Sequence, residues 1–203
     1  VSDQHGTAEI TVTVEDAGPD KNLETVSDNL RTTTTFEVTV DPVNDLPTLS
    51  NINKFVGRED AAARTIVLHG ITAGGGETQP LRLTAASQNT ELVPHPTVTY
   101  TSADPSGTLT FAPTADQFGT TRIDVTLEDG GLDNNLATSD DNGMTTRSFD
   151  VEIEPVNDPP HFQSPADFEI AEDAGQQTVA LREIHAGGGE NQHLRVTASS
   201  SNP

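Results

Sequence analysis

Pro42-Val43-Asn44-Asp45-Leu46-Pro47 recurs 113 residues later as Pro155-Val156-Asn157-Asp158-Pro159-Pro160. The prolines in each copy fix φ and restrict the residue before them to extended backbone, so neither copy suits a helix or a central strand. Each copy therefore predicts a stiff, extended connector that carries one amide and one carboxylate side chain.

The rest of the chain repeats with the same spacing and without insertions. Glu59-Asp60 returns as Glu172-Asp173, and the stretch Ala-Gly-Gly-Gly-Glu at 73–77 returns at 186–190. A fixed period of this kind is typical of a tandem array of one structural unit. The connectors divide the chain into the second half of one unit (1–43), a complete unit (44–156) and the first half of the next (157–203).

A half unit cannot bury its apolar face alone. Two arrangements satisfy this requirement. Either the chain is a window on a longer array, or the terminal halves of neighbouring molecules complete each other. The sequence leaves both arrangements open.

Apolar and polar residues alternate with a period of two throughout the repeat. Ile10, Val12 and Val14 alternate with threonines, and Phe149, Val151 and Ile153 do the same in the complete unit. This pattern, rich in β-branched residues, predicts half-buried strands. For the complete unit we expect seven strands, near 48–57, 64–69, 81–87, 96–102, 107–112, 120–128 and 145–154.

Seven short strands in about 110 residues are typical of an all-β, antiparallel Greek-key sandwich. The chain contains no cysteine and no tryptophan, so the disulfide and tryptophan of an immunoglobulin domain are absent. The predicted architecture is a series of such seven-stranded sandwiches joined end to end.

The composition is strongly acidic, with a formal net charge of −22. This argues against binding to nucleic acids or anionic membranes and favours cationic partners, divalent metal ions first. The acidity has a simpler interpretation too, because net charge keeps an extracellular protein soluble. No apolar run approaches the roughly 20 residues of a membrane-spanning helix.

A family resemblance emerges from the end of the complete unit. Glu128-Asp129-Gly130 precedes the last expected strand, and Glu154-Pro155-Val156-Asn157-Asp158-Pro159-Pro160 follows it. This arrangement resembles the cadherin-like tandem repeats of very large bacterial surface proteins. The resemblance covers the whole 113-residue unit, and it implies an extracellular or cell-surface location, with Ca²⁺ ions that stiffen the joints between domains.

The resemblance also implies which residues hold the ions. At the second connector we expect Asn157, Asp158, Glu59, Asp60, Asp116 and, from the next unit, Glu190. At the first connector we expect Asp3, Asn44, Asp45, Glu77 and Asp129. Glu172 and Asp173, the repeat copies of Glu59 and Asp60, are further expected metal ligands. Compared with cadherins, the chain has Asp116-Gln117-Phe118 in place of Asp-Arg-Glu, and Gly-Gly-Gly-Glu in place of Asp-x-Asp. We therefore expect at most one ion at each joint. The alternative is that the connector side chains only make hydrogen bonds that shape a turn.

A second acidic cluster lies between the last two expected strands. It contains Asp129, Asp133, Asn135 and Asp141. Its spacing lacks the alternating ligands and closing glutamate of an EF-hand loop. Either this connection binds Ca²⁺ in an extended loop, or it is a solvated loop rich in Asx turns.

No arrangement of residues predicts an enzyme. The six histidines are scattered, and neither a Ser-His-Asp set nor a pair of catalytic carboxylates has a scaffold. We expect a structural protein: a stalk, surface fibre or adhesin shaft whose partners are neighbouring repeats, other copies of the chain, or a ligand on a cell surface or matrix. The alternatives are a self-assembling filament subunit and a carbohydrate- or protein-binding accessory module.

Overall fold

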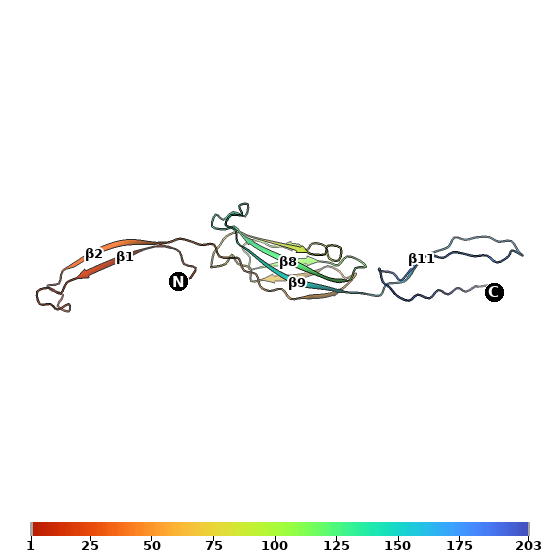
Figure 1. The fold of residues 1–203 in the computed structure, drawn as a ribbon, viewed down its shortest axis with the longest axis horizontal. Coiled ribbons are helices and arrows are strands. Elements are labelled where there is room, and N and C mark those ends of the chain that lie inside the picture. Colours follow the sequence, from red (N-terminus) through yellow and green to blue (C-terminus); the bar gives the residue numbers. More distant parts are fainter. Residues whose placement is uncertain (1, 203) are drawn as a thin grey trace.

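The computed structural model describes residues 2–202. The first residue of segment 1–43, Val1, and the last residue of segment 157–203, Pro203, lie outside the described residues. Figure 1 shows an elongated molecule with a hairpin, a central sandwich and a C-terminal segment arranged along its long axis. Within residues 2–202 the structure has strands and no helix, so this part of the chain contains no helix that could cross a membrane.

The central part is a sandwich of two sheets. The first sheet has four strands in the order β3 (Phe55–Arg58), β9 (Met144–Glu154), β8 (Gly119–Asp129) and β5 (Leu81–Ser87). The second sheet has three strands in the order β4 (Arg64–His69), β7 (Ser106–Phe111) and β6 (Thr97–Thr99). This is the connectivity of a Greek-key sandwich, so the predicted fold class is confirmed.

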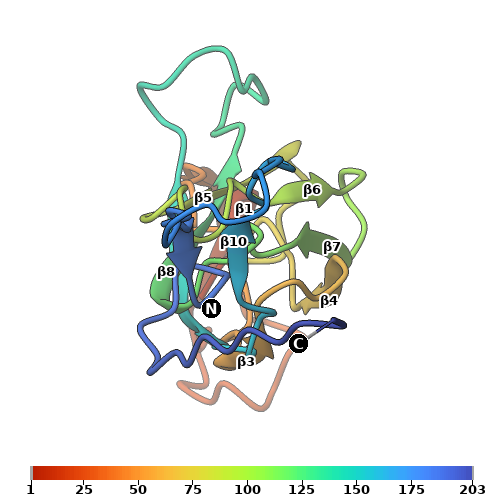
Figure 2. The same ribbon diagram turned by 90° about the vertical axis from the view of Figure 1, so that its right-hand side faces the viewer.

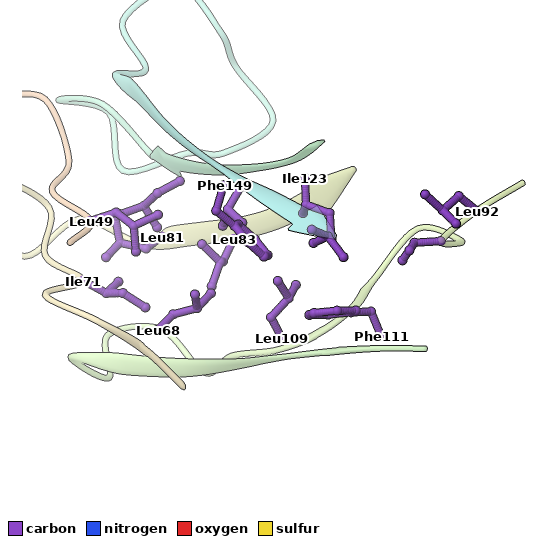
Figure 3. Close-up of a cluster of buried hydrophobic side chains, with 14 of the residues drawn as sticks. Leu49, Leu68, Ile71, Leu81, Leu83, Leu92, Leu109, Phe111, Ile123 and Phe149 are labelled. Atoms are coloured by element: carbon purple, nitrogen blue, oxygen red, sulfur yellow. The ribbon is translucent and has the colours of Figure 1, made fainter. Parts of the chain in front are cut away.

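The core lies between the two sheets and follows the alternation of the sequence. On β8, Ile123, Val125 and Leu127 are fully buried, while the residues between them point outward. They pack against Leu109 and Phe111 of β7 on the facing sheet, as Figure 3 shows. Successive side chains of a strand point to opposite faces of the sheet. The alternating apolar residues therefore all lie on the inner face and form one continuous apolar layer.

One strand pair departs from the expected antiparallel arrangement. β3 pairs with β9 in parallel, with Phe55 opposite Val151 and Arg58 opposite Glu154. The first expected strand, 48–57, is also shortened to β3, and its beginning makes only an isolated bridge between Thr48 and Thr72. Because parallel strands end at the same edge of a sheet, the end of β3 lies beside the end of β9.

The segments on either side of the sandwich are two-stranded. β1 (Gly6–Glu15) and β2 (Arg31–Val40) form an antiparallel hairpin, and β10 (His161–Gln163) pairs with β11 (Arg182–His185). The hairpin is the repeat copy of β8 and β9. Figure 2, viewed along the long axis, shows the connection between β8 and β9 standing away from the sandwich.

Candidate metal centre

The parallel pairing of β3 with β9 brings Glu59 against the second connector. The Glu59 backbone N–H donates to the carbonyl of Glu154 at 3.0 Å, and Glu59 Oε1 accepts the backbone N–H of Val156 at 2.6 Å. Glu59 is 2% exposed, and its second oxygen, Oε2, is buried with no hydrogen-bond partner. A buried acceptor without a partner is costly, so this oxygen is suited to a cation.

Three aspartates meet beside Glu59. Asp60, Asp116 and Asp158 each place one carboxylate oxygen within 4.8 Å of the others. They come from the end of β3, the turn before β8 and the connector. The backbone N–H of Asp116 donates to Asp60 Oδ1 at 3.1 Å, which fixes the turn against the end of β3. Within residues 2–202, this is the only group of three potential metal-ligating side chains at such distances.

The carboxylates of the cluster act on one another electrostatically. Burial, and after it the charges of Asp60, Asp116, Glu190 and Glu59, raises the pKa of Asp158 above its ordinary value. Asp158 Oδ2 is buried and has no hydrogen-bond partner. Ca²⁺ takes six to eight oxygen ligands in irregular geometry, so the set of carboxylates fits this ion, with the remaining ligands left to carbonyl groups and water.

The glycine turn of the next unit closes over the connector. Glu190 Oε2 accepts the backbone N–H of Asp158 at 3.0 Å. Gly188 has a φ of +42°, and a Cβ at this position would collide with the Asp158 carboxylate. A side chain is therefore excluded here by both the left-handed backbone and the close approach of Asp158.

Two hydrogen bonds of the second connector recur at the first connector. The backbone N–H of Asp45 donates to Glu77 Oε2 at 3.1 Å, and Gln79 Nε2 donates to Asn44 Oδ1 at 2.6 Å. At the second connector, Gln192 Nε2 donates to Asn157 Oδ1 at 2.8 Å. Sequence reasoning missed both glutamines, although they too are separated by the 113-residue period. Asp3, Asp45 and Glu77 line one shared hollow beside the first connector.

Asp129 lies at the other end of β8 from the aspartate cluster. It is fully buried, and its Oδ1 accepts the backbone N–H groups of Gly131 at 2.9 Å and Gly143 at 2.8 Å, together with Asn44 Nδ2 at 3.2 Å. Asp129 therefore joins the first connector to the β8–β9 connection. Its Oδ2 is buried without a hydrogen-bond partner.

The other predicted ligands of the acidic loop are bound to its own backbone. Asp133 Oδ1 accepts the N–H of Asn135 at 2.9 Å, Asn135 Oδ1 accepts the N–H of Ala137 at 3.1 Å, and Asp141 Oδ2 accepts the N–H of Leu132 at 2.8 Å. These are mostly Asx-type turns. They do not bring three carboxylates together.

Glu172 and Asp173 lie away from any joint in the described part of the chain. They are exposed in a turn that is closed by a hydrogen bond from the Ala174 N–H to the Ala171 carbonyl at 3.3 Å. Asp173 has the same left-handed backbone as its copy Asp60, with φ values of 64° and 59°. The local turn is thus reproduced without the neighbours that surround Asp60.

Comparison with known proteins gives structural likeness at low identity. No family model and no curated protein matches the chain. Domains 4 and 5 of the S-layer protein SbsC are similar over 73% of this chain and 58% of that chain, at 19% identity and a TM-score of 0.41. SbsC domains 1–6 match over 78% of this chain and 18% of that one, at 17% identity and a TM-score of 0.40. Extracellular cadherin domains 1–5 of protocadherin gamma B2 match over 81% of this chain and 28% of that one, at 15% identity and a TM-score of 0.41.

The chain therefore spans 58% and 18% of the two SbsC structures. Likeness at this level says nothing about ligands or activity. The assignment of a Greek-key sandwich rests on the strand order and the core described above.

Proposed function

We propose that the chain is a non-enzymatic structural module of an extracellular or surface array, in which Ca²⁺ stiffens the joint between consecutive sandwiches. The repeat of 113 residues supplies the array, and the acidic composition suits an extracellular protein that binds divalent cations. Its partners are neighbouring repeats of the same chain. The observation that carries the proposal is the meeting of Asp60, Asp116 and Asp158 where the sandwich joins its connector.

The proposed ion acts by joining three segments that otherwise repel each other. Asp60 and Asp116 belong to the sandwich, and Asp158 belongs to the connector. A bound Ca²⁺ offsets the repulsion among these carboxylates and restricts the bending of the connector relative to the sandwich. The unpartnered oxygens of Glu59 and Asp158 support this role, because each gains a partner when the ion is present.

The expected energetic effect is appreciable. An ion that binds only the folded state adds about 2.7 kcal/mol to the free energy of unfolding at a free concentration of ~100 Kd. Single domains have total stabilities of roughly 5–15 kcal/mol. Calcium should therefore raise the melting temperature of the sandwich and reduce the spread of shapes that the chain adopts.

Thermal unfolding and small-angle X-ray scattering, each in Ca²⁺ and in excess chelator, test the proposal. We expect a higher melting temperature and a longer, narrower distribution of interatomic distances in Ca²⁺. Identical melting and scattering profiles in the two conditions would remove the metal from the proposal.

A matched pair of variants locates the ion. Asp158→Asn should abolish the calcium-dependent rise in melting temperature while leaving the sandwich folded in chelator. Asp133→Asn, in the β8–β9 connection, should retain the full rise. Loss of the rise in Asp133→Asn alone would place the ion in the acidic loop instead.

A further inference from the structure

Asn142-Gly143 is the only Asn-Gly pair in the sequence. Such a pair is chemically labile, because glycine has no side chain to hinder its backbone nitrogen. The Gly143 nitrogen attacks the side-chain carbonyl carbon of Asn142, its proton passes to the amide group, and ammonia leaves. Water then opens the resulting succinimide ring at either carbonyl and yields aspartate or isoaspartate. The pair is therefore a candidate site of deamidation, a reaction that needs no reactant besides water.

The attacking nitrogen is held by a buried carboxylate. The Gly143 N–H donates to Asp129 Oδ1 at 2.8 Å, and Asp129 is fully buried. The backbone N–H of Asp129 donates in turn to the Gly143 carbonyl at 3.1 Å. The nitrogen of a succinimide carries no proton, so ring closure removes the hydrogen bond to the carboxylate. Because that carboxylate is buried, the loss opposes the reaction in the folded chain.

The side chain of Asn142 is restrained as well. Its Nδ2 donates to Glu128 Oε1 at 3.0 Å, and the buried Glu128 is itself bound through Oε2 by Arg82. Asn142 Oδ1 is buried and has no hydrogen-bond partner. The attack places negative charge on this oxygen, and a buried site without a donor does not stabilise that charge. The fold therefore opposes the reaction at the side chain too.

The first connector covers the same glycine. A Cβ at Gly143 would lie 2.6 Å from Asp129 Oδ2, 3.1 Å from Pro47 Cδ and 3.2 Å from Asn44 Nδ2. Asn44 Nδ2 also donates to Asp129 Oδ1 at 3.2 Å and to the Asp141 carbonyl at 3.1 Å. The packing that leaves no room for a side chain at position 143 creates the labile pair, and the same packing encloses it.

The repeat copy has the same contacts without the labile pair. Asn29 Nδ2 donates to Glu15 Oε1 at 3.1 Å, and the backbone N–H of Leu30 donates to Asp16 Oδ1 at 3.0 Å. The Leu30 side chain hinders its own backbone nitrogen, so succinimide formation at Asn29 is much slower. Asn29 is therefore a comparison site within the same chain.

We propose that Asn142 is a deamidation site that the folded unit holds closed and that opens when the first connector leaves Gly143. Deamidation adds a carboxylate beside Glu128, and the two like charges repel. Isoaspartate also adds a carbon atom to the backbone, which displaces the Gly143 N–H from Asp129. The reaction thus turns a reversible opening of the connector into a permanent one.

Ageing of the 203-residue chain at mildly alkaline pH, followed by peptide mapping for aspartate and isoaspartate, tests the proposal. Deamidation at Asn142 should be at least ~10-fold slower in the folded chain than in urea, because the folded chain reacts only through its open form. Asn29 should react much more slowly than Asn142 in urea. A folded chain that deamidates at Asn142 as fast as the unfolded chain would overturn the proposal.

A matched pair of variants tests the role of the connector. Asn44→Ala removes the hydrogen bonds to Asp129 and Asp141 and should speed deamidation of Asn142 at least ~3-fold without denaturant. Asn157→Ala changes the repeat copy at the second connector and should leave the rate unchanged. Circular dichroism checks that both variants are folded. Equal rates in the two folded variants would contradict control by the first connector.

The consequence for stability is tested with the aged protein. Aged wild type should melt at a lower temperature than fresh wild type, in proportion to the fraction deamidated at Asn142. Asn142→Gln, whose longer side chain forms the cyclic imide far more slowly, should melt at the same temperature before and after ageing. Equal losses in wild type and Asn142→Gln would mean that damage elsewhere, and not at Asn142, weakens the aged chain.

Discussion

Glu59 accepts a hydrogen bond from the backbone N–H of Val156 at 2.6 Å, although the two residues are 97 positions apart in the chain. Glu59 follows β3, and Val156 lies in the connector that leaves β9. The contact closes the end of the sandwich from which the next unit continues. It also holds a buried carboxylate beside the three aspartates of the candidate metal centre.

Glu59→Ala should lower the free energy of unfolding by about 1–3 kcal/mol, because the partly buried N–H of Val156 loses its acceptor. Chemical denaturation in chelator measures this effect without a contribution from metal. Glu59→Gln keeps an oxygen at the same position and should cost less. Equal losses in the two variants would mean that the charge of Glu59, rather than its hydrogen bond, stabilises the end of the sandwich.

Asp129→Ala should be among the most destabilising single substitutions in the sandwich. It leaves the N–H groups of Gly131 and Gly143 and the amide of Asn44 without their shared acceptor, which costs about 3 kcal/mol or more. Urea unfolding followed by circular dichroism provides the measurement. Asp104→Ala removes an exposed carboxylate and should stay within about 0.5 kcal/mol of wild type. A small effect of Asp129→Ala would show that water replaces the carboxylate.

Gly75→Ala and Gly76→Ala separate steric collision from backbone strain. Both glycines have positive φ, +44° and +80°, so alanine is strained at each by roughly 1 kcal/mol. At Gly75 the new Cβ also meets the Asp45 carboxylate, whereas at Gly76 no heavy atom lies within 4 Å. Thermal unfolding should therefore show a larger loss for Gly75→Ala. Equal losses would mean that the Asp45 side chain moves aside at little cost.

Asp124 contributes to the dependence of stability on pH. Hydrogen bonds from Ser148 and then Gln88 lower the pKa of the Asp124 carboxyl group. The unfolded chain therefore holds this proton more tightly than the folded chain does. The stabilisation is complete above the ordinary aspartate pKa of about 3.9 and is lost as the pH falls through the lower pKa of the folded state.

Asp124→Asn removes this contribution. Between about pH 4 and pH 2, the free energy of unfolding of the variant should fall less steeply than that of wild type. Urea titrations at a series of pH values check the slope. Arg147→Gln, which leaves the Asp124 carboxylate in place, should retain the wild-type slope. Parallel curves for wild type and Asp124→Asn would show that Asp124 does not set the acid sensitivity.

The candidate site was predictable in part. The 113-residue spacing singled out both connectors, the glycine turns and Glu59-Asp60, and the resemblance to cadherin-like repeats assigned Asp60, Asp116 and Asp158 to one joint. Gln79 and Gln192 lie outside the connectors and the glycine turns, so the sequence does not mark them as ligands. Their role is visible only in the hydrogen bonds that they donate to the connector asparagines.

The carboxylates of the β8–β9 connection show what composition alone leaves open. Asp133 and Asp141 occur in a run of oxygen-bearing side chains, which is what a calcium loop requires. In the folded chain their oxygens accept backbone N–H groups, so their positions are set by turns within the loop. A sequence records how many carboxylates a loop has but does not record the direction in which each one points.

The sequence by itself determined the repeat, the strands and the sandwich. Those features depend on spacing along the chain: the 113-residue period, and the alternation that sends every second side chain of a strand to the same face. Only the tertiary structure decided that β3 runs parallel to β9. That pairing brings Glu59 to the connector and Asp60 to Asp158. The pairing joins segments about 100 residues apart and depends on how the whole sandwich packs, which no local pattern in the sequence encodes.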